Sequence, residues 1–368
     1  MVTKYPLSIL ASIALIAAGA NLAQAQESPD IHVVVNMVQL NIAVTDRKGN
    51  YVTGLRPEDF AIQEDGIAEK AATFSEGDGP TRSVDELAQG NPAAPPSSVP
   101  GSDGASQNFS SEINGANVFI LFDTSDYMYR GFVFAQDAIC DFVRSLGTAD
   151  KIALYSYSRD LSRASSLTSD RGQLLKAVRS TVAGDQAALY NALLLTLKDA
   201  AQYRGKKVVV VFSNGPDNSS VVPPEDVAEF AQSSGVSIYM ISTQQARLEP
   251  VSTAVFDRMT AATGGKAYFS KNWRDEWRAF ASIRDDLAHL YSLSYYPKPN
   301  QNNGWRAITV RLVGEKLKKY KVRTRNGYRP QPTRFSADVK TATSGPPVPA
   351  LQAPQPEIES KETDSPRR

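Results

Sequence analysis

Acidic and hydroxyl side chains follow a buried apolar run near residue 120. The run at 118–122 is continuous and apolar, and Asp123, Thr124 and Ser125 come directly after it. A short apolar run that ends in small polar residues is typical of a central parallel strand. In open α/β sheets ligands bind beyond the carboxyl ends of such strands, so these oxygen atoms predict a binding site there. Tyr127 is a bulky ring at a position where such a site needs a small hydroxyl.

The elements that must position these side chains alternate between strand and helix. Strand-like runs occur at 117–123, 151–158, 207–213, 236–243 and 266–270, with a hairpin partner near 161–167. Helical stretches occur at 130–147, 170–181, 188–203, 224–234, 251–263 and 273–288. This alternation predicts an α/β fold: a doubly wound, mostly parallel sheet of six strands that helices cover on both faces.

The segments on either side of this region have the two-residue period of β-strands. Apolar and polar residues alternate within 31–75, where one short strand is expected at 51–55, and again within 291–325. Each set of strands is too small to build a stable core alone. We therefore predict that strands from residues 26–75 and 290–329 form one small β-sandwich. The α/β domain at 116–289 is then inserted between its two halves.

Three further segments are expected to lie outside these domains. Residues 1–25 combine Lys4, an apolar run at 7–20 and small residues before Gln26, which predicts a cleaved secretory signal peptide. The apolar run is shorter than the roughly 18 residues that a membrane span needs. We therefore expect a secreted or periplasmic protein without a transmembrane segment. Segments 76–115 and 330–368 are rich in Pro, Gly, Ser and Ala and predict a disordered linker and tail.

The composition gives no support to several functional classes. The formal net charge of +1 offers no basis for a nucleic-acid partner. Cys140 is the only cysteine. One predicted helical face near it carries Phe134, Ala138, Phe142 and Val143, which predicts that Cys140 is a small buried side chain rather than a nucleophile. The two histidines, His32 and His289, lie near no nucleophile motif. We therefore expect no catalytic residues and no enzymatic activity.

Residues 115–290 resemble a von Willebrand factor A (VWA) domain, through the three segments Asp123-Thr124-Ser125-Asp126-Tyr127, Ala187-Ala188-Leu189-Tyr190 and Ser213-Asn214-Gly215. Nearly the whole mature chain is similar to an exported bacterial group, the VWFA-related Acidobacterial domain proteins. That likeness rests on the leading segment at 36–66, YSLSYYP at 291–297 and RTRNGY at 323–328. The resemblance implies a six-stranded sheet with a metal-ion-dependent adhesion site (MIDAS) at its upper edge.

The MIDAS residues carry over to this chain only in part. Asp123 and Ser125 match the family's first Asp and first Ser, whereas Tyr127 replaces the second Ser. Ala187 replaces a Thr, and Asn214 replaces an Asp. Mg²⁺ requires six oxygen ligands at about 2.0–2.1 Å in near-octahedral geometry. Ala187 supplies no side-chain oxygen, and Asn214 supplies a neutral one, so a tight cation site and a bound cofactor are not expected.

Two functional hypotheses follow from this degenerate site. The first is an exported, non-enzymatic protein-interaction or adhesion module whose VWA domain binds a protein or a cell-envelope component without a metal. Its candidate partner contacts are Tyr127, Tyr129 and Asp217, because they lie near the same edge. The alternative is an adhesion module that holds Mg²⁺ or Mn²⁺ weakly at a remodelled site. That site would use Asp123, Ser125 and Asn214, with Asp217 as a further candidate ligand.

A basic run lies near the end of the second set of strands. Strand alternation places Lys319, Lys321, Arg323 and Arg325 on one face. Such charges protect a sheet edge against aggregation. The functional interpretation is a patch that contacts anionic envelope material.

Overall fold

The computed structural model describes residues 37–88, 115–148, 150–242 and 250–330. All of these residues belong to one compact unit that begins at Met37. The predicted signal peptide, most of the predicted linker and nearly all of the predicted tail lie outside the described residues.

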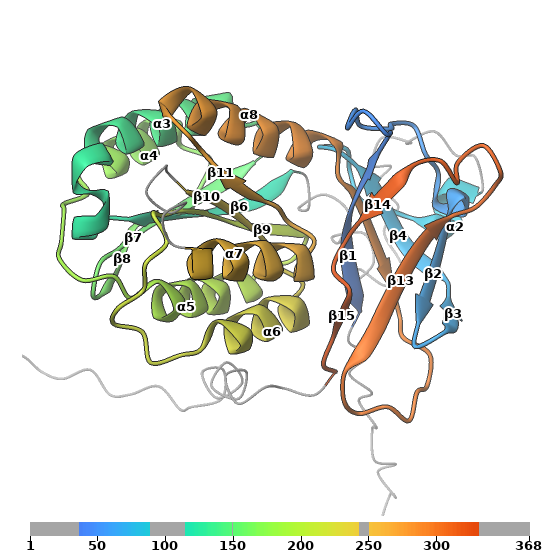
Figure 1. Cartoon of the computed structure of the whole chain (residues 1–368). Helices are drawn as coiled ribbons and strands as arrows, with labels where there is room; N and C mark the ends of the chain where they lie inside the picture. The colour runs from blue at the N-terminus through green and yellow to red at the C-terminus, as the bar shows by residue number, and fades with distance from the viewer. Residues whose placement is uncertain (1–36, 89–114, 149, 243–249, 331–368) are drawn as a thin grey trace, which may run out of the picture. The chain divides into compact units, whose positions relative to one another are not determined.

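The α/β region is built on a six-stranded sheet. Its strand order is β11 (Ala267–Phe269), β10 (Ser237–Ser242), β9 (Lys206–Phe212), β6 (Ala116–Asp123), β7 (Lys151–Tyr157) and β8 (Leu161–Thr168). Neighbouring strands are parallel, except that β8 runs antiparallel to β7. β6 therefore lies between β9 and β7, and its carboxyl end lies at the centre of the sheet edge (Figure 1).

Helices cover both faces of this sheet, as the alternating sequence predicts. On one face α3 (Phe132–Ser145), α4 (Arg171–Arg179) and α8 (Trp273–His289) pack on the strands (Figure 1). On the other face lie α5 (Leu189–Ala201), α6 (Pro224–Ser234) and α7 (Pro250–Ala262). Side chains of β6 alternate between the two cores: Ile120 packs with the first set and Leu121 with the second. Cys140 is buried in α3, as predicted.

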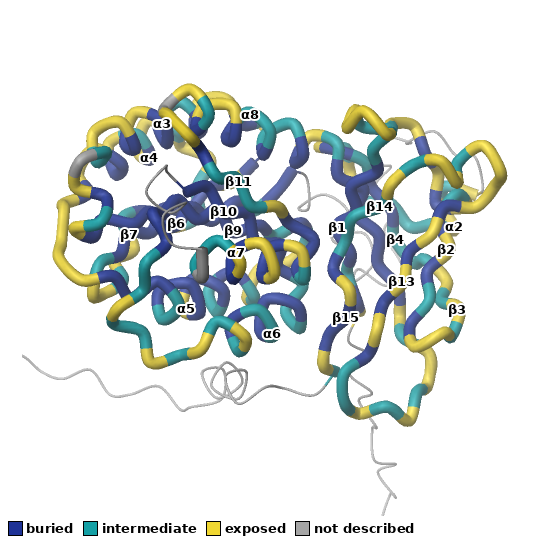
Figure 2. The backbone as a smooth tube through the Cα atoms, viewed as in Figure 1, coloured by how far each residue is buried: buried dark blue, intermediate teal, exposed yellow. Residues whose placement is uncertain are grey.

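Two antiparallel sheets form the predicted β-sandwich. The first has the order β14 (Lys321–Arg323), β1 (Val38–Thr45), β12 (Tyr291–Tyr295), β4 (Ala71–Glu76) and β5 (Arg82–Ser83). The second has the order β15 (Gly327–Tyr328), β13 (Arg306–Leu312), β2 (Phe60–Glu64) and β3 (Ile67–Glu69). Each sheet combines strands from before and after the α/β region, and their apolar faces share one buried core (Figure 2).

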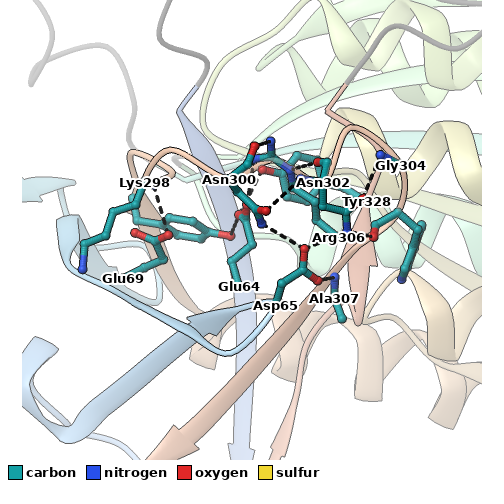
Figure 3. A network of polar contacts seen from close by, with 12 residues as sticks. Glu64, Asp65, Glu69, Lys298, Asn300, Asn302, Gly304, Arg306, Ala307 and Tyr328 are labelled. Atoms are coloured by element: carbon teal, nitrogen blue, oxygen red, sulfur yellow. Dashed lines mark hydrogen bonds and ion pairs between the residues drawn. The ribbon is translucent and has the colours of Figure 1, made fainter.

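A buried ionic network connects the two sheets of the sandwich. The carboxylate of Glu64 pairs with Arg306 at 2.9 Å and accepts hydrogen bonds from the hydroxyls of Tyr295 and Tyr328 (Figure 3). Tyr295 belongs to the first sheet and the other three residues to the second. The ion pair and the two tyrosine hydrogen bonds offset the cost of removing these charges from water. Residues from both halves of the sequence thus hold the sandwich together.

Three expectations from the sequence differ from the structure. The predicted linker begins too early, because β5 and α2 (Val84–Ala88) are ordered and packed on β4. Helical spacing predicts Phe134 on the buried face of α3, yet it is 65% exposed, and Val133 beside it in the first turn is exposed as well. The expected strand near residues 51–55 is reduced to a single bridge between Tyr51 and Thr45.

The basic run does not form one solvent-facing row. β14 is an edge strand, as a protective role would require. Arg325, however, is buried and donates hydrogen bonds to the backbone carbonyls of Gln232 in α6 and Gln39 in β1. Burial lowers the pKa of Arg325 to about 10. Arg325 lies after the end of β14 and forms only an isolated bridge with Thr263, so the alternating pattern predicts neither its place in the sheet nor this docking against the α/β region.

Candidate functional site

The carboxylate of Asp123 lies at the end of β6 and is completely buried. One of its oxygens accepts a hydrogen bond from the backbone N–H of Ser125 at 2.9 Å. The other oxygen accepts one from the hydroxyl of Ser213 at 2.7 Å. Burial raises the pKa of Asp123, and these hydrogen bonds oppose the shift because they stabilise the charged form.

Ser213 connects Asp123 to the neighbouring strand. It follows β9, and its hydroxyl accepts hydrogen bonds from the hydroxyl of Tyr157 at 3.0 Å and from the backbone N–H of Gly215 at 3.0 Å. A hydroxyl has one donor and two acceptor lone pairs, so these three contacts use its full capacity. Both Asp123 oxygens therefore have protein donors.

The hydroxyl of Ser125 is different because it has no hydrogen-bond partner although it is buried. An unpartnered buried hydroxyl costs on the order of 1–3 kcal/mol. The side-chain oxygen of Ser125, a predicted metal ligand, is therefore available to an ion or a water.

Three loops surround these residues at the carboxyl end of the sheet, and we call them the rim loops. The first is 124–131, the second 182–188 and the third 213–222. The backbone N–H of Gly184 in the second loop donates to the carbonyl of Thr124 in the first at 2.7 Å. A Cβ atom at Gly184 would lie only 2.3 Å from the hydroxyl of Ser158, so this position requires glycine. Direct backbone contacts thus fix the first two loops against each other.

Asn214 is turned toward the first rim loop. Its side-chain amide donates a hydrogen bond to the backbone carbonyl of Tyr127. Asp123, Ser125 and Asn214 therefore do converge at one edge, but the Asn214 side chain acts as a donor there. Tyr127 is half-buried, and its hydroxyl accepts a hydrogen bond from the Asn218 side chain at 3.3 Å.

Asp217 has a local structural role in the third loop. One of its carboxylate oxygens accepts a hydrogen bond from the backbone N–H of Tyr190 in the first turn of α5, at 2.9 Å. The other accepts from the backbone N–H groups of Ser219 and Ser220. Asp217 thus caps α5 from outside the helix and stabilises its own loop.

The residues at this edge do not fit a Mg²⁺ ion bound in the family's way. Asp123 already accepts two hydrogen bonds, the Asn214 amide donates to a carbonyl, and Ala187 has no side-chain oxygen. In the part of the chain that the structure describes, no three His, Cys, Asp or Glu side chains form a group that could hold a metal. The side chains at this edge therefore offer fewer oxygen ligands than the family's site, and the ion requires six.

Large apolar side chains are exposed around the rim loops. They lie within the three loops or in the first turn of α3, and each is between 61% and 88% exposed: Tyr129, Val133, Phe134, Val182 and Val221. Phe132 differs, because its ring stacks on Phe122 in the core. Of the predicted partner contacts, Tyr129 is thus the most accessible.

Two further residues of this site, Ser213 and Asn218, are not among those that the sequence predicts. Ser213 follows the apolar run of β9 directly, and a hydroxyl at the end of a central strand is a signal that indicates a group able to support Asp123. No sequence signal identifies Asn218, because its role depends on how the three loops fold together.

The histidine that the structure describes lies away from this edge. His289 ends α8, and its ring stacks on Tyr51 with the ring centres 4.9 Å apart. Its Nδ1 atom lies 2.6 Å from the backbone carbonyl of Asp285. Within the described ranges, no helix combines the length and apolar character that crossing a lipid bilayer requires.

Comparison with protein families agrees with this architecture. Residues 117–282 match the family model of the von Willebrand factor type A domain. The match covers the six-stranded sheet and the helices packed on it. This region of the chain is therefore a VWA domain.

Solved structures with the same type of domain share little sequence with this chain. BatB, a conserved hypothetical protein from Bacteroides thetaiotaomicron, is 15% identical over 47% of this chain and 97% of its own, with a TM-score of 0.40. The vWF domain of the type V pili tip protein Mfa5 from Porphyromonas gingivalis is 13% identical over 47% of this chain and 95% of its own, with a TM-score of 0.42. Proximal thread matrix protein 1 from the mussel byssus, with a zinc-occupied MIDAS motif, is 13% identical over 51% of this chain and 49% of its own, with a TM-score of 0.41. The search of curated proteins gave no match.

Proposed function

We propose that this VWA domain is an exported, non-enzymatic interaction module that binds a protein partner through its rim loops without a divalent cation. The observation that carries the proposal is the hydrogen bonding of Asp123 and Asn214. Both oxygens of the Asp123 carboxylate accept hydrogen bonds from protein groups, and the Asn214 amide donates to a backbone carbonyl where the family has a carboxylate ligand for the ion.

The exposed apolar residues around the rim support a protein partner. Aromatic side chains are enriched in protein interfaces because they bury a large area at a small entropic cost. Tyr129 and Phe134 are such side chains, and they lie beside the degenerate site. The finer prediction of a VWFA-related Acidobacterial protein, and with it a secreted or periplasmic location, remains part of this proposal.

A second candidate function is adhesion through a weak, remodelled cation site. The unpartnered hydroxyl of Ser125 favours it, because a Mg²⁺ or Mn²⁺ ion with several waters would satisfy that oxygen. In that case the ion would also contact Asp123 through water.

Calorimetry on the mature protein separates the two candidates. We expect no heat of binding from Mg²⁺ or Mn²⁺. Micromolar binding of either ion that Asp123→Ala abolishes would establish the second candidate and contradict the first.

Capture from envelope extract then tests the partner surface. The full mature chain should retain the same partner in EDTA and in Mg²⁺, and Tyr129→Ala together with Phe134→Ala should reduce its retention. Tyr296→Ala is the matched control, because Tyr296 is an exposed aromatic residue that follows β12. Retention that EDTA abolishes, or that the rim variants leave unchanged, would contradict the proposal.

A further inference from the structure

We infer that the side-chain amides of Asn214 and Asn218 join the three rim loops where the family uses a divalent cation, so that the rim keeps its shape without an ion. This inference rests on the proposed metal-independent function and explains how such a rim can be ordered. We refer to the hydrogen bonds of these two amides as the amide bridge.

Asn218 contacts all three rim loops. It belongs to the third loop, and its side-chain oxygen accepts a hydrogen bond from the backbone N–H of Ala187 in the second loop at 3.0 Å. Its side-chain nitrogen donates to the hydroxyl of Tyr127 in the first loop at 3.3 Å. Its own backbone N–H also donates to the carbonyl of Ala187 at 3.0 Å. One side chain thus cross-links three segments that are far apart in sequence.

Asn214 adds a second link that a carboxylate could not make. Its amide nitrogen donates to the backbone carbonyl of Tyr127. An aspartate has only acceptor oxygens when ionised, so it would face that carbonyl with repulsion instead of a hydrogen bond. The amide at position 214 therefore supplies a contact that depends on the absence of the family's carboxylate.

Tyr127 receives both links. Its backbone carbonyl accepts from Asn214 and its phenol hydroxyl from Asn218. A serine at this position has a hydroxyl too close to the backbone to occupy the same place. The substitutions at Tyr127 and Asn214 each remove a cation ligand and supply a side chain that makes a hydrogen bond between loops. Ala187 removes a third ligand and takes part in the amide bridge through its backbone N–H.

Hydrogen exchange on the full mature chain tests the amide bridge without any partner. In the wild type, exchange in the three rim loops should be the same in EDTA and in millimolar Mg²⁺. Asn218→Ala and Asn214→Asp should each accelerate exchange roughly three- to tenfold in at least two of the loops, because each removes a link between loops. The matched control is Asn117→Ala, whose side-chain amide donates to the carbonyl of Arg204 at the opposite end of β6.

Restoring the family ligands provides a second measurement. The triple variant Tyr127→Ser, Ala187→Thr, Asn214→Asp should bind Mg²⁺ in calorimetry, and its rim exchange should slow when Mg²⁺ is added. Failure of the folded triple variant to bind Mg²⁺ would show that the amide bridge does not occupy the place of the ion.

Two other outcomes would overturn the inference. The first is that hydrogen exchange in the rim loops of the wild type is slower in Mg²⁺ than in EDTA. The second is that Asn218→Ala and Asn214→Asp both accelerate exchange only in the third loop. If an asparagine variant does not fold, the comparison of wild-type exchange in EDTA and in Mg²⁺ still tests the inference. Because these experiments use no partner, their failure leaves the proposed function to be tested separately by EDTA-resistant capture.

Discussion

Asp123 is a buried carboxylate whose two oxygens are both hydrogen-bonded by the protein. Burial of Asp123 favours its neutral, protonated form. The hydrogen bonds from Ser125 and Ser213 favour its charged form. The net direction is a raised pKa, so the folded state holds this proton more tightly than the unfolded state, whose Asp123 has the ordinary value of 3.8. The stabilising contribution from its protonation is therefore complete below that value and is lost as the pH rises through the folded-state pKa.

Asp123→Asn should remove this component of the pH dependence. We expect the stability of the wild type, relative to the variant, to decline as the pH rises from below 3.8 toward neutral. Urea unfolding at a series of pH values measures the difference. Asp126→Asn, at an exposed neighbour, is the control and should follow the wild type. Parallel curves for wild type and Asp123→Asn would contradict the raised pKa.

At the scale of elements, α5 begins without a capping side chain of its own. Its N-cap position is Ala188, and the carboxylate of Asp217 in the third rim loop accepts the hydrogen bond from Tyr190 instead. The start of α5 and the third loop therefore stabilise each other. This link also explains why Asp217 is unsuited to serve as a metal ligand.

Asp217→Ala should lower the free energy of unfolding by about 1 kcal/mol, the usual effect of removing an N-cap. Asp217→Asn should retain much of that stability, since its amide oxygen can still accept from Tyr190. Thermal unfolding in EDTA and in Mg²⁺ provides the measurement. If Asp217→Ala lowers the stability only in Mg²⁺ and not in EDTA, Asp217 binds the metal and does not act as a helix cap.

Much of the fold is predictable from the sequence, because it depends on local periodicity. The unbroken apolar run of β9 and the alternating residues of β13 each indicate their burial pattern directly. Contacts between distant segments carry no such signal. Arg325 follows the strand period of an exposed edge, yet it is buried because α6 and β1 offer it carbonyl groups. The hydrogen bonds of Asn218 are equally invisible in the sequence.

At the scale of the whole molecule, Asp286 connects the VWA domain to the sandwich. Its buried carboxylate accepts hydrogen bonds at 2.8 Å from the hydroxyls of Tyr51 and Tyr239, and it pairs with Arg323. Tyr239 lies in the central sheet, whereas Tyr51 and Arg323 belong to the N- and C-terminal strand regions. The two parts of the fold should therefore unfold together.

Asp286→Ala should destabilise the full chain by on the order of 3 kcal/mol, because Arg323, the buried Tyr239 hydroxyl and the partly buried Tyr51 hydroxyl lose this acceptor. It should also separate the single unfolding transition into two. Asp285→Ala is the control, since the Asp285 carboxylate is about half exposed and pairs only with its neighbour Arg284. Calorimetry and residue-specific fluorescence measure both effects. A protein of residues 115–290 that is as stable as the full chain would contradict this coupling.

The junction between α8 and β12 has a mechanical consequence. α8 ends at His289 and β12 begins at Tyr291, so Leu290 alone separates the helix from the strand. β12 is hydrogen-bonded to β1 on one side and to β4 on the other. A pulling force that a bound partner exerts on the VWA domain is therefore transmitted from α8 directly to β12, an interior strand. The backbone hydrogen bonds of β12 to β1 and to β4 must resist this force together.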